Sequence, residues 1–251
     1  MNNRWLFIGN DERFRICQQL AEVEGKKAVL VPETTCIEEL EEMIEQFQPG
    51  QIVFPIRPLA VRPNPQVIPE NATLYVGGGD AAVRDDYRQT MHCYLKDEGF
   101  LVANAKLTAE AWVHHFYTTC HSAIYKKEFI VAGFGRVGKA VAARLQQNEA
   151  EVRVLSADPT ERQAAKEAGY DVAPLTSSVD MVDAYVINTI PIQWYTPEKT
   201  LPLRLFDLAS FPHCLTDATR FEYDTVLPTL PGKHFPIDAA KLLYRTLRRL
   251  A

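Results

Sequence analysis

Short apolar runs alternate with amphipathic stretches along the whole chain. The runs have strand length and are rich in Val, Ile, Leu and Phe, and the stretches between them place apolar residues at helical spacing. In the first half, strands are predicted at residues 5–9, 28–32, 51–55, 73–76 and 99–103. A helix from Ala81 to about Glu98 is expected between the last two. Parallel strands joined by helices imply an α/β layer structure.

The second half repeats this alternation. Its predicted strands are residues 129–132, 151–155, 170–173, 182–188, 205–209 and 224–227. A linking helix, with Thr108 as its N-cap, precedes the first of them. The chain ends in an amphipathic helix, 237–250, whose leucines need a surface to pack on.

We therefore predict two Rossmann-like doubly wound parallel-sheet domains. The first comprises residues 1–107, a helix at 108–127 links it to the second, and an NAD(P)-binding domain occupies residues 128–235. The C-terminal helix, 236–251, is expected to pack back on the first domain. Ligands of open parallel sheets lie outside the carboxyl ends of the strands. Loops at 188–191, 209–213 and 229–235 are therefore expected to share one cleft with the turn at 133–138.

That turn reads Gly133-Phe134-Gly135-Arg136-Val137-Gly138 and lies between a predicted strand and a predicted helix. Such a context makes G-x-G-x-x-G a dinucleotide-binding fingerprint. Gly133 permits the tight turn, Gly135 lets the backbone approach a pyrophosphate, and Gly138 lets the helix pack against the strand. The free N–H groups at the helix N-terminus favour the diphosphate. Asp158, about 20 residues further on, is placed to bind the adenosine ribose.

Composition excludes several classes of protein. Hydrophobic residues make up 47% and charged residues 24% of the 251 residues, as in globular proteins, and the net charge of −5 gives no indication of a nucleic-acid partner. Neither a bilayer-spanning run nor a signal peptide is recognisable, so no membrane partner is expected. The five cysteines are scattered and never spaced C-x-x-C, which fits reduced thiols and predicts a cytoplasmic location.

No metal site is expected. His114 and His121 fall on one face of the linking helix, but a metal would need further ligands at matching spacing. We interpret both as ordinary core or surface histidines rather than as metal ligands.

Several motifs occur in the order and spacing of the A subunit of dipicolinate synthase, and the chain resembles that family over essentially its whole length. The motifs are residues 8–13, 104–111, 133–138, 188–191, 207–212 and 230–232. The resemblance implies two Rossmann-like domains and oxidation of a dihydrodipicolinate-type precursor to pyridine-2,6-dicarboxylate in sporulating bacteria. It therefore implies a small-molecule carboxylate substrate and a flavoprotein-like B subunit as partner. A homo-oligomer is also expected.

The chain departs from the family at three places. Phe211 replaces an arginine, His213 and Cys214 replace a double glycine, and Ala157 replaces a basic residue that would meet a 2′-phosphate. The cofactor is therefore NAD or NADP. Asp158 favours NAD, whereas Ser156 and Arg162 keep NADP open.

Candidate roles follow for the remaining residues. Asn188, Thr189, Pro191 and Ser210 are expected to line the nucleotide passage. His234 or His213 would act as proton acceptor. Glu110 matches a family motif and is the third catalytic candidate, with helix capping as its structural alternative.

Three functions remain open on the sequence. The first is an oxidoreductase that resembles the A subunit of dipicolinate synthase. The second is a relative of the D-2-hydroxyacid dehydrogenases, and the third is a non-catalytic dinucleotide-binding sensor or partner subunit.

Overall fold

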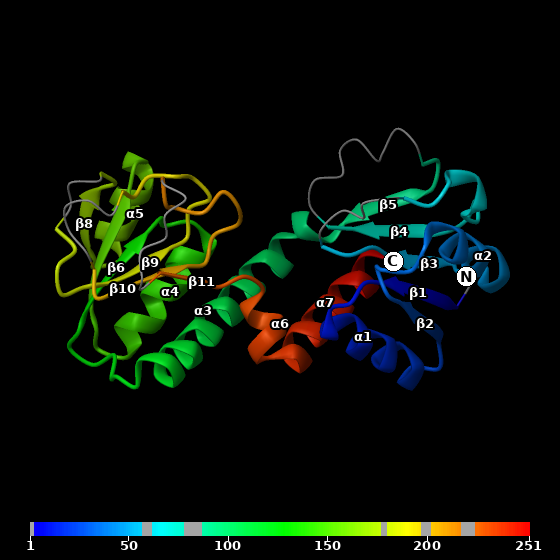
Figure 1. The fold of residues 1–251 in the computed structure, drawn as a ribbon, viewed down its shortest axis with the longest axis horizontal. Coiled ribbons are helices and arrows are strands. Elements are labelled where there is room, and N and C mark those ends of the chain that lie inside the picture. The colour runs from blue at the N-terminus through cyan, green and yellow to red at the C-terminus, as the bar shows by residue number, and fades with distance from the viewer. Residues whose placement is uncertain (1–2, 57–61, 78–86, 177–179, 197–201, 217–223) are drawn as a thin grey trace. The chain divides into compact units, whose positions relative to one another are not determined.

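The structure is a computed structural model that describes residues 3–56, 62–77, 87–176, 180–196, 202–216 and 224–251. The chain forms two compact units. Unit 1 comprises Met1–Asn104 and Pro231–Ala251, and unit 2 comprises Ala105–Leu230. Each contains one parallel sheet with helices packed on it (Figure 1).

The sheet of unit 1 has the strand order β2-β1-β3-β4-β5, and all its pairings are parallel. The strands are β1 (Arg4–Ile8), β2 (Lys27–Val31), β3 (Gln51–Val53), β4 (Thr73–Val76) and β5 (Thr90–Cys93). The helices are α1 (Glu12–Val23), α2 (Ile37–Phe47), α7 (Pro236–Leu250) and the short 3-10 turns η1 (Pro65–Val67) and η3 (Tyr94–Lys96).

Strand β1 shows how this sheet builds a core on both faces. Trp5 and Phe7 point into a cluster that contains residues of α1 and α7, whereas Leu6 and Ile8 point into a cluster that contains residues of α2. All four side chains are buried. Because alternate residues of a strand face opposite sides, the continuous apolar run predicts a strand covered on both faces.

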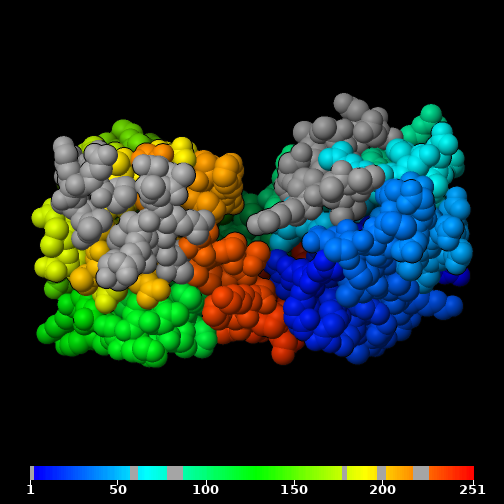
Figure 2. All heavy atoms as spheres, viewed as in Figure 1, coloured from blue at the N-terminus to red at the C-terminus, as the bar shows by residue number. Residues whose placement is uncertain are grey.

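The C-terminal helix returns to unit 1, as predicted, and packs on α1. The Cys17 thiol donates to the Ala240 carbonyl (3.4 Å), and the Tyr244 hydroxyl donates to Glu24 (2.9 Å). In Figure 2 orange-red atoms of the C-terminal segment lie against blue atoms of the N-terminal segment, in keeping with the packing of α7 on α1. The apolar face of α7 thus finds the surface that its sequence pattern requires.

The sheet of unit 2 has the strand order β11-β10-β9-β6-β7-β8, again parallel throughout. The strands are β6 (Glu128–Ala132), β7 (Glu151–Ser156), β8 (Asp171–Pro174), β9 (Tyr185–Asn188), β10 (Arg204–Asp207) and β11 (Asp224–Val226). Its helices are α3 (Glu98–Cys120, which starts in unit 1), α4 (Arg136–Gln147) and α5 (Pro159–Glu167), and α6 (Leu230–His234) follows β11 at the unit boundary. Numbered from β6, this is the order 3-2-1-4-5-6 of a dinucleotide-binding sheet.

Aromatic residues of α3 cover one face of this sheet. Trp112 and Phe116 are fully buried and pack edge-on against Phe129 of β6 and Phe206 of β10, with ring centroids 5.4 to 6.1 Å apart. The other face buries Ile130, Val186 and neighbouring apolar residues. The fold class predicted from the sequence is confirmed.

Some predicted elements are wrong. Residues 90–93, expected inside a helix from Ala81, form β5, and residues 81–86 lie outside the described part of the chain. Residues 99–103, expected as a strand, form the first turns of α3, so Thr108 lies within a helix and is not an N-cap. The Asp97 side chain caps the start of α3, where it accepts from the Phe100 N–H at 2.7 Å. Residues 230–234, expected as a loop, form α6.

No helix in the described ranges combines the length and the apolar character that crossing a membrane requires.

Candidate dinucleotide site

The turn after β6 has the conformation that its glycines predict. Gly133 has a φ of +93°, and its N–H donates to the Leu155 carbonyl at 2.7 Å. A Cβ at Gly133 would lie 2.6 Å from Thr189 Oγ1, and a Cβ at Gly138 would lie 2.1 Å from the Gly133 carbonyl oxygen. The left-handed turn and the close approach of α4 to the strand therefore both require glycine.

Gly135 differs from the other two glycines because packing does not require it. Its φ of −70° suits any residue, and the one described atom that a Cβ would approach is Glu161 Oε1 at 3.9 Å. Gly135 is also the N-cap of α4, which has no side-chain cap and no acidic residue in its first turn. The open side of Gly135 and the uncapped helix end fit an anion that approaches the backbone closely.

Two loops meet where the order of the sheet reverses, between β6 and β9. The Thr189 N–H and hydroxyl both donate to the Ala132 carbonyl, at 2.9 and 2.8 Å. Pro191 is exposed just beyond this contact, and Arg136 and Val137 begin α4 on the other side. Ligands of doubly wound sheets bind at such a reversal. The structure thus brings the predicted residues of 133–138 and 188–191 together.

At the end of β7, the polar side chains hydrogen-bond to one another and to the backbone. Asp158 is the N-cap of α5 and accepts from the Thr160 N–H at 2.7 Å. The Arg162 guanidinium donates to the carbonyls of Ser156 (2.7 Å) and Ala157 (2.9 Å). Buried Ser156 donates through its hydroxyl to Glu161 (2.7 Å), and the same carboxylate oxygen accepts from the Phe134 N–H at 3.0 Å. Glu161 therefore joins the end of β7 to the glycine turn.

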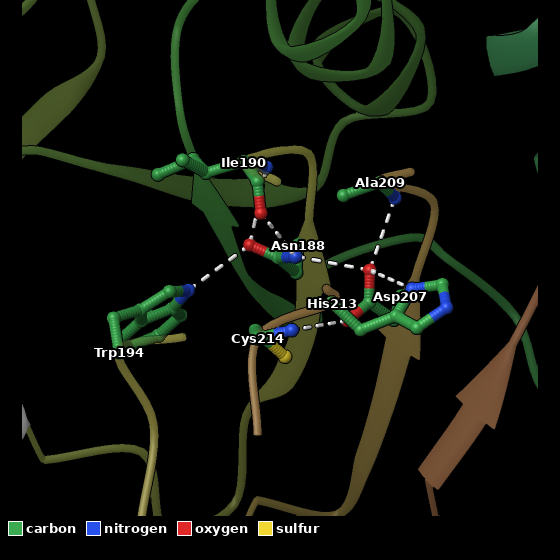
Figure 3. A network of polar contacts seen from close by, with 7 residues as sticks. All are labelled: Asn188, Ile190, Trp194, Asp207, Ala209, His213 and Cys214. Atoms are coloured by element: carbon green, nitrogen blue, oxygen red, sulfur yellow. Dashed lines mark hydrogen bonds and ion pairs between the residues drawn. The ribbon is translucent and has the colours of Figure 1, made fainter. Parts of the chain in front are cut away.

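A buried polar network lies at the ends of β9 and β10 (Figure 3). The Asn188 amide donates to Asp207 Oδ1 (3.0 Å) and to the Ile190 carbonyl (3.0 Å), and its oxygen accepts from Trp194 Nε1 (3.0 Å). Asp207, 2% exposed, also accepts from the backbone N–H groups of Ala209 (3.0 Å) and Cys214 (2.8 Å). These bonds satisfy a buried carboxylate and fix both loops.

His213 lies beside this network. Its φ is +68°, and its Nδ1 is buried, makes no hydrogen bond among the described residues, and lies 3.8 Å from Asp207 Oδ1. The side chain remains 27% exposed, so the ring can meet a ligand. Ser210 and Phe211, which precede it in this loop, are exposed, Phe211 at 85%.

The other two catalytic candidates lie on helices, Glu110 on α3 and His234 on α6. Glu110, on α3, forms an ion pair with Arg144 on α4 (2.9 Å), with both side chains about half exposed. This pair joins two helices at the surface. Capping, its predicted alternative, is wrong because α3 starts twelve residues earlier, at Glu98. His234 is the last residue of α6 and belongs to unit 1.

Sequence reasoning missed Asp207, Trp194 and Glu161. Asp207 ends an apolar run, and a charged residue in a buried strand requires partners, so this position carried a recognisable signal. Glu161 lies in an ordinary first helical turn, where an acidic residue is common. Among the described residues, no group of three or more His, Cys, Asp or Glu side chains is placed to hold a metal.

The sheet order, the glycine turn and the loop at the reversal point together define a protein of two Rossmann-like units, the second a dinucleotide-binding domain. Residues 108–194 match the family model described as S-adenosyl-L-homocysteine hydrolase, NAD binding domain. Unit 2 is therefore an NAD-binding type of Rossmann domain.

Solved structures match the whole chain. The A subunit of dipicolinate synthase from Bacillus halodurans gives a TM-score of 0.75 at 20% identity, covering 98% of this chain and 97% of the other. The corresponding dipicolinate synthase structure from Bacillus subtilis gives 0.74 at 19% identity, covering 100% and 96%. D-Lactate dehydrogenase from Escherichia coli gives 0.57 at 12% identity, covering 98% and 95%. These likenesses establish the fold. No curated protein matches the chain significantly by sequence.

Proposed function

We propose that the protein is an NAD(P)-dependent oxidoreductase that acts on a small carboxylate. One observation carries the proposal: Gly135, at the uncapped end of α4 and beside the reversal of the sheet, keeps an open side that internal packing does not need. A pyrophosphate needs such a backbone approach.

The chain's own groups divide the binding task. The N-cap of α4, Gly135, has no side chain to cap the helix, and the backbone N–H groups of the first turn of α4 would hold the pyrophosphate. Thr189 and Pro191 would line the passage from the pyrophosphate toward the substrate. A bound nicotinamide would supply the hydride chemistry.

His213 is the proposed proton acceptor. The buried carboxylate 3.8 Å from Nδ1 can orient the imidazole, so that Nε2 would be the nitrogen that accepts the proton. Asp207 is itself fixed by two backbone N–H groups and Asn188, so it orients the ring without moving. Asp207 and Asn188 are thus positioning residues.

The substrate to test first is a dihydrodipicolinate-type precursor, since two whole-chain structural neighbours come from dipicolinate synthases. A flavoprotein-like B subunit and a homo-oligomeric state belong to the same proposal. Phe211 stands where the dipicolinate synthase family has an arginine. A panel of other small carboxylates should therefore be tested as substrates beside this precursor.

The experiment has two stages. Calorimetric titration of the full chain with NAD and with NADP is expected to show binding of at least one nucleotide. A dihydrodipicolinate-generating mixture is then expected to reduce the bound nucleotide, with or without added B-type subunit. Binding without turnover on any carboxylate of the panel would favour the non-catalytic alternative, and failure to bind either nucleotide would refute the proposal.

The His213 role has a matched control. His213 and exposed His121 are both histidines of unit 2 at positive φ, where Asn is also tolerated. His213→Asn is expected to lower kcat about a hundredfold while nucleotide affinity is unchanged, and His121→Asn to alter neither. Equal loss of activity in both variants would assign the effect to folding.

A further inference from the structure

Two acidic side chains follow the end of β7, the region where a doubly wound sheet binds the adenosine ribose, and they make different contacts. Asp158, which the sequence favours, is exposed and caps α5 through the Thr160 N–H. Its carboxylate is held at the helix start rather than at the glycine turn. It therefore serves the end of a helix, which is a frequent role for such a residue.

The Glu161 side chain instead reaches the glycine turn at 133–138. Its Oε2 is anchored by two donors, the Ser156 hydroxyl at 2.7 Å and the Phe134 N–H at 3.0 Å. Its Oε1 makes no hydrogen bond among the described residues and lies 3.9 Å from where a Cβ of Gly135 would be. One oxygen is thus fixed, and the other faces the open side of the pyrophosphate turn.

We propose that Glu161, and not Asp158, receives the ribose diol of the adenosine and makes unit 2 select NAD over NADP. This inference rests on the proposed function and assigns its cofactor. In a doubly wound sheet the adenosine ribose lies at the end of the second strand, beside the glycine turn. Glu161 brings a carboxylate there from the first turn of α5, and its unpaired oxygen can accept from a ribose hydroxyl.

The same placement disfavours NADP. A 2′-phosphate would bring a second anion against the Glu161 carboxylate, and like charges at contact distance repel strongly where water is partly excluded. The neighbouring cation, Arg162, is tied through Nη1 to the carbonyls of Ser156 and Ala157. Ala157 supplies no charge at the strand end. The charges around the end of β7 therefore favour an uncharged ribose diol over a 2′-phosphate.

The test compares two substitutions that each remove one negative charge and keep the side-chain shape. Calorimetry on the full chain gives dissociation constants for NAD and NADP in wild type, Glu161→Gln and Asp158→Asn. Asn retains helix capping, so Asp158→Asn keeps the start of α5. Wild type is expected to prefer NAD. Glu161→Gln should weaken NAD binding and strengthen NADP binding, so that the ratio of the two dissociation constants changes about tenfold or more in favour of NADP. Asp158→Asn should leave this ratio unchanged.

Ser156→Ala is the second variant, with melting temperatures to confirm folding of each protein. It removes one hydrogen bond to the Glu161 carboxylate but keeps the negative charge, so affinity for NAD should fall while affinity for NADP does not rise. Together the two variants separate the effect of the position of the carboxylate from the effect of its charge. It also keeps the proposal falsifiable if Glu161→Gln does not fold.

Three results would overturn the assignment of Glu161. They are a preference unchanged in folded Glu161→Gln, a preference that moves in Asp158→Asn instead, and equal tightening of both nucleotides in Glu161→Gln. The last result would mean that the carboxylate blocks the Phe134 N–H and competes with any dinucleotide. A wild-type chain that binds neither nucleotide would refute the proposed function, whereas one that binds both in a ratio insensitive to Glu161 would refute only this inference.

Discussion

Both units contain the same module, a buried strand followed by a glycine turn and a helix, but the two helix starts are capped differently. In unit 1, β1 leads through Gly9, at φ +148°, into α1. In unit 2, β6 leads through Gly133, at φ +93°, into α4. Both glycines have backbone conformations that side chains rarely adopt.

In the first module, acidic side chains cap the start of the helix. Asp11 caps α1 by accepting from the Arg13 N–H at 2.9 Å, and it pairs with the buried Arg13 guanidinium. Glu12 adds a second acid in the first turn. The Phe14 ring occupies the space beside Gly9, where a Cβ would be 2.9 Å from it. The positive end of α1 thus meets carboxylates of its own chain.

The second module leaves that end open. Gly135 provides no side-chain cap, and no acid lies in the first turn of α4. The difference shows that a Rossmann-like strand-turn-helix is only a frame for anion binding. Whether it accepts a diphosphate depends on which residue occupies the N-cap.

The largest effect is expected for Gly138→Ala, which breaks the second module. The new Cβ would lie 2.1 Å from the Gly133 carbonyl oxygen, so α4 must move away from β6. We expect a loss of about 3 kcal/mol or more in the free energy of unfolding, despite the better helix propensity of Ala. Urea denaturation followed by circular dichroism measures it. A change within about 0.5 kcal/mol would contradict the tight packing.

The next effect comes from making the second module resemble the first. Gly135→Asp gives α4 the acidic N-cap that α1 has, at a backbone conformation that Asp adopts readily. Stability should change by less than about 1 kcal/mol, because the acidic cap is favourable but the Glu161 carboxylate beside Gly135 repels it. Nucleotide affinity should fall about a hundredfold through charge repulsion and lost space. Calorimetry beside thermal melting separates the two. Gln147→Ala, at the far exposed end of α4, should change neither.

A smaller effect is expected for Asp11→Ala in the first module. It removes a helix cap and also leaves the guanidinium of Arg13, with a side chain 6% exposed, without its partner. We expect a loss of about 2 kcal/mol. Asp158→Ala is the control because it removes only an exposed cap, and about 1 kcal/mol should be lost. Equal losses would show that the Arg13 pair adds nothing.

The smallest effect is a pH dependence of the first module. Burial alone raises the pKa of the Asp11 carboxyl, but the hydrogen bonds and charge of Arg13 outweigh it and lower the pKa below its ordinary value. A lowered folded-state pKa means that the stability contribution is complete above about pH 4 and is lost as the pH falls from there. Melting temperatures of wild type should thus fall more steeply than those of Asp11→Asn below about pH 4. Parallel curves would refute the contribution of this pair.

Local signals account for what the sequence predicted well. The period of the apolar residues placed most strands, and the spacing of Gly133, Gly135 and Gly138 gave the turn, because both depend on neighbours within a few residues. The errors at 90–103 have the same origin. Residues 100–103 are apolar enough for either a strand or a helix, and the capping Asp97 was the signal that would have decided.

The sequence by itself determined the two parallel sheets, the return of the last helix to the first unit and the glycine turn of the second. Tertiary structure alone decided which acid faces that turn, since Asp158 and Glu161 are only three residues apart and both belong to one helix start. It also decided that Asp207, His213 and Asn188 form one network. Such contacts join the ends of different strands, and their partners are fixed by sheet order and side-chain direction, which spacing along the chain does not encode.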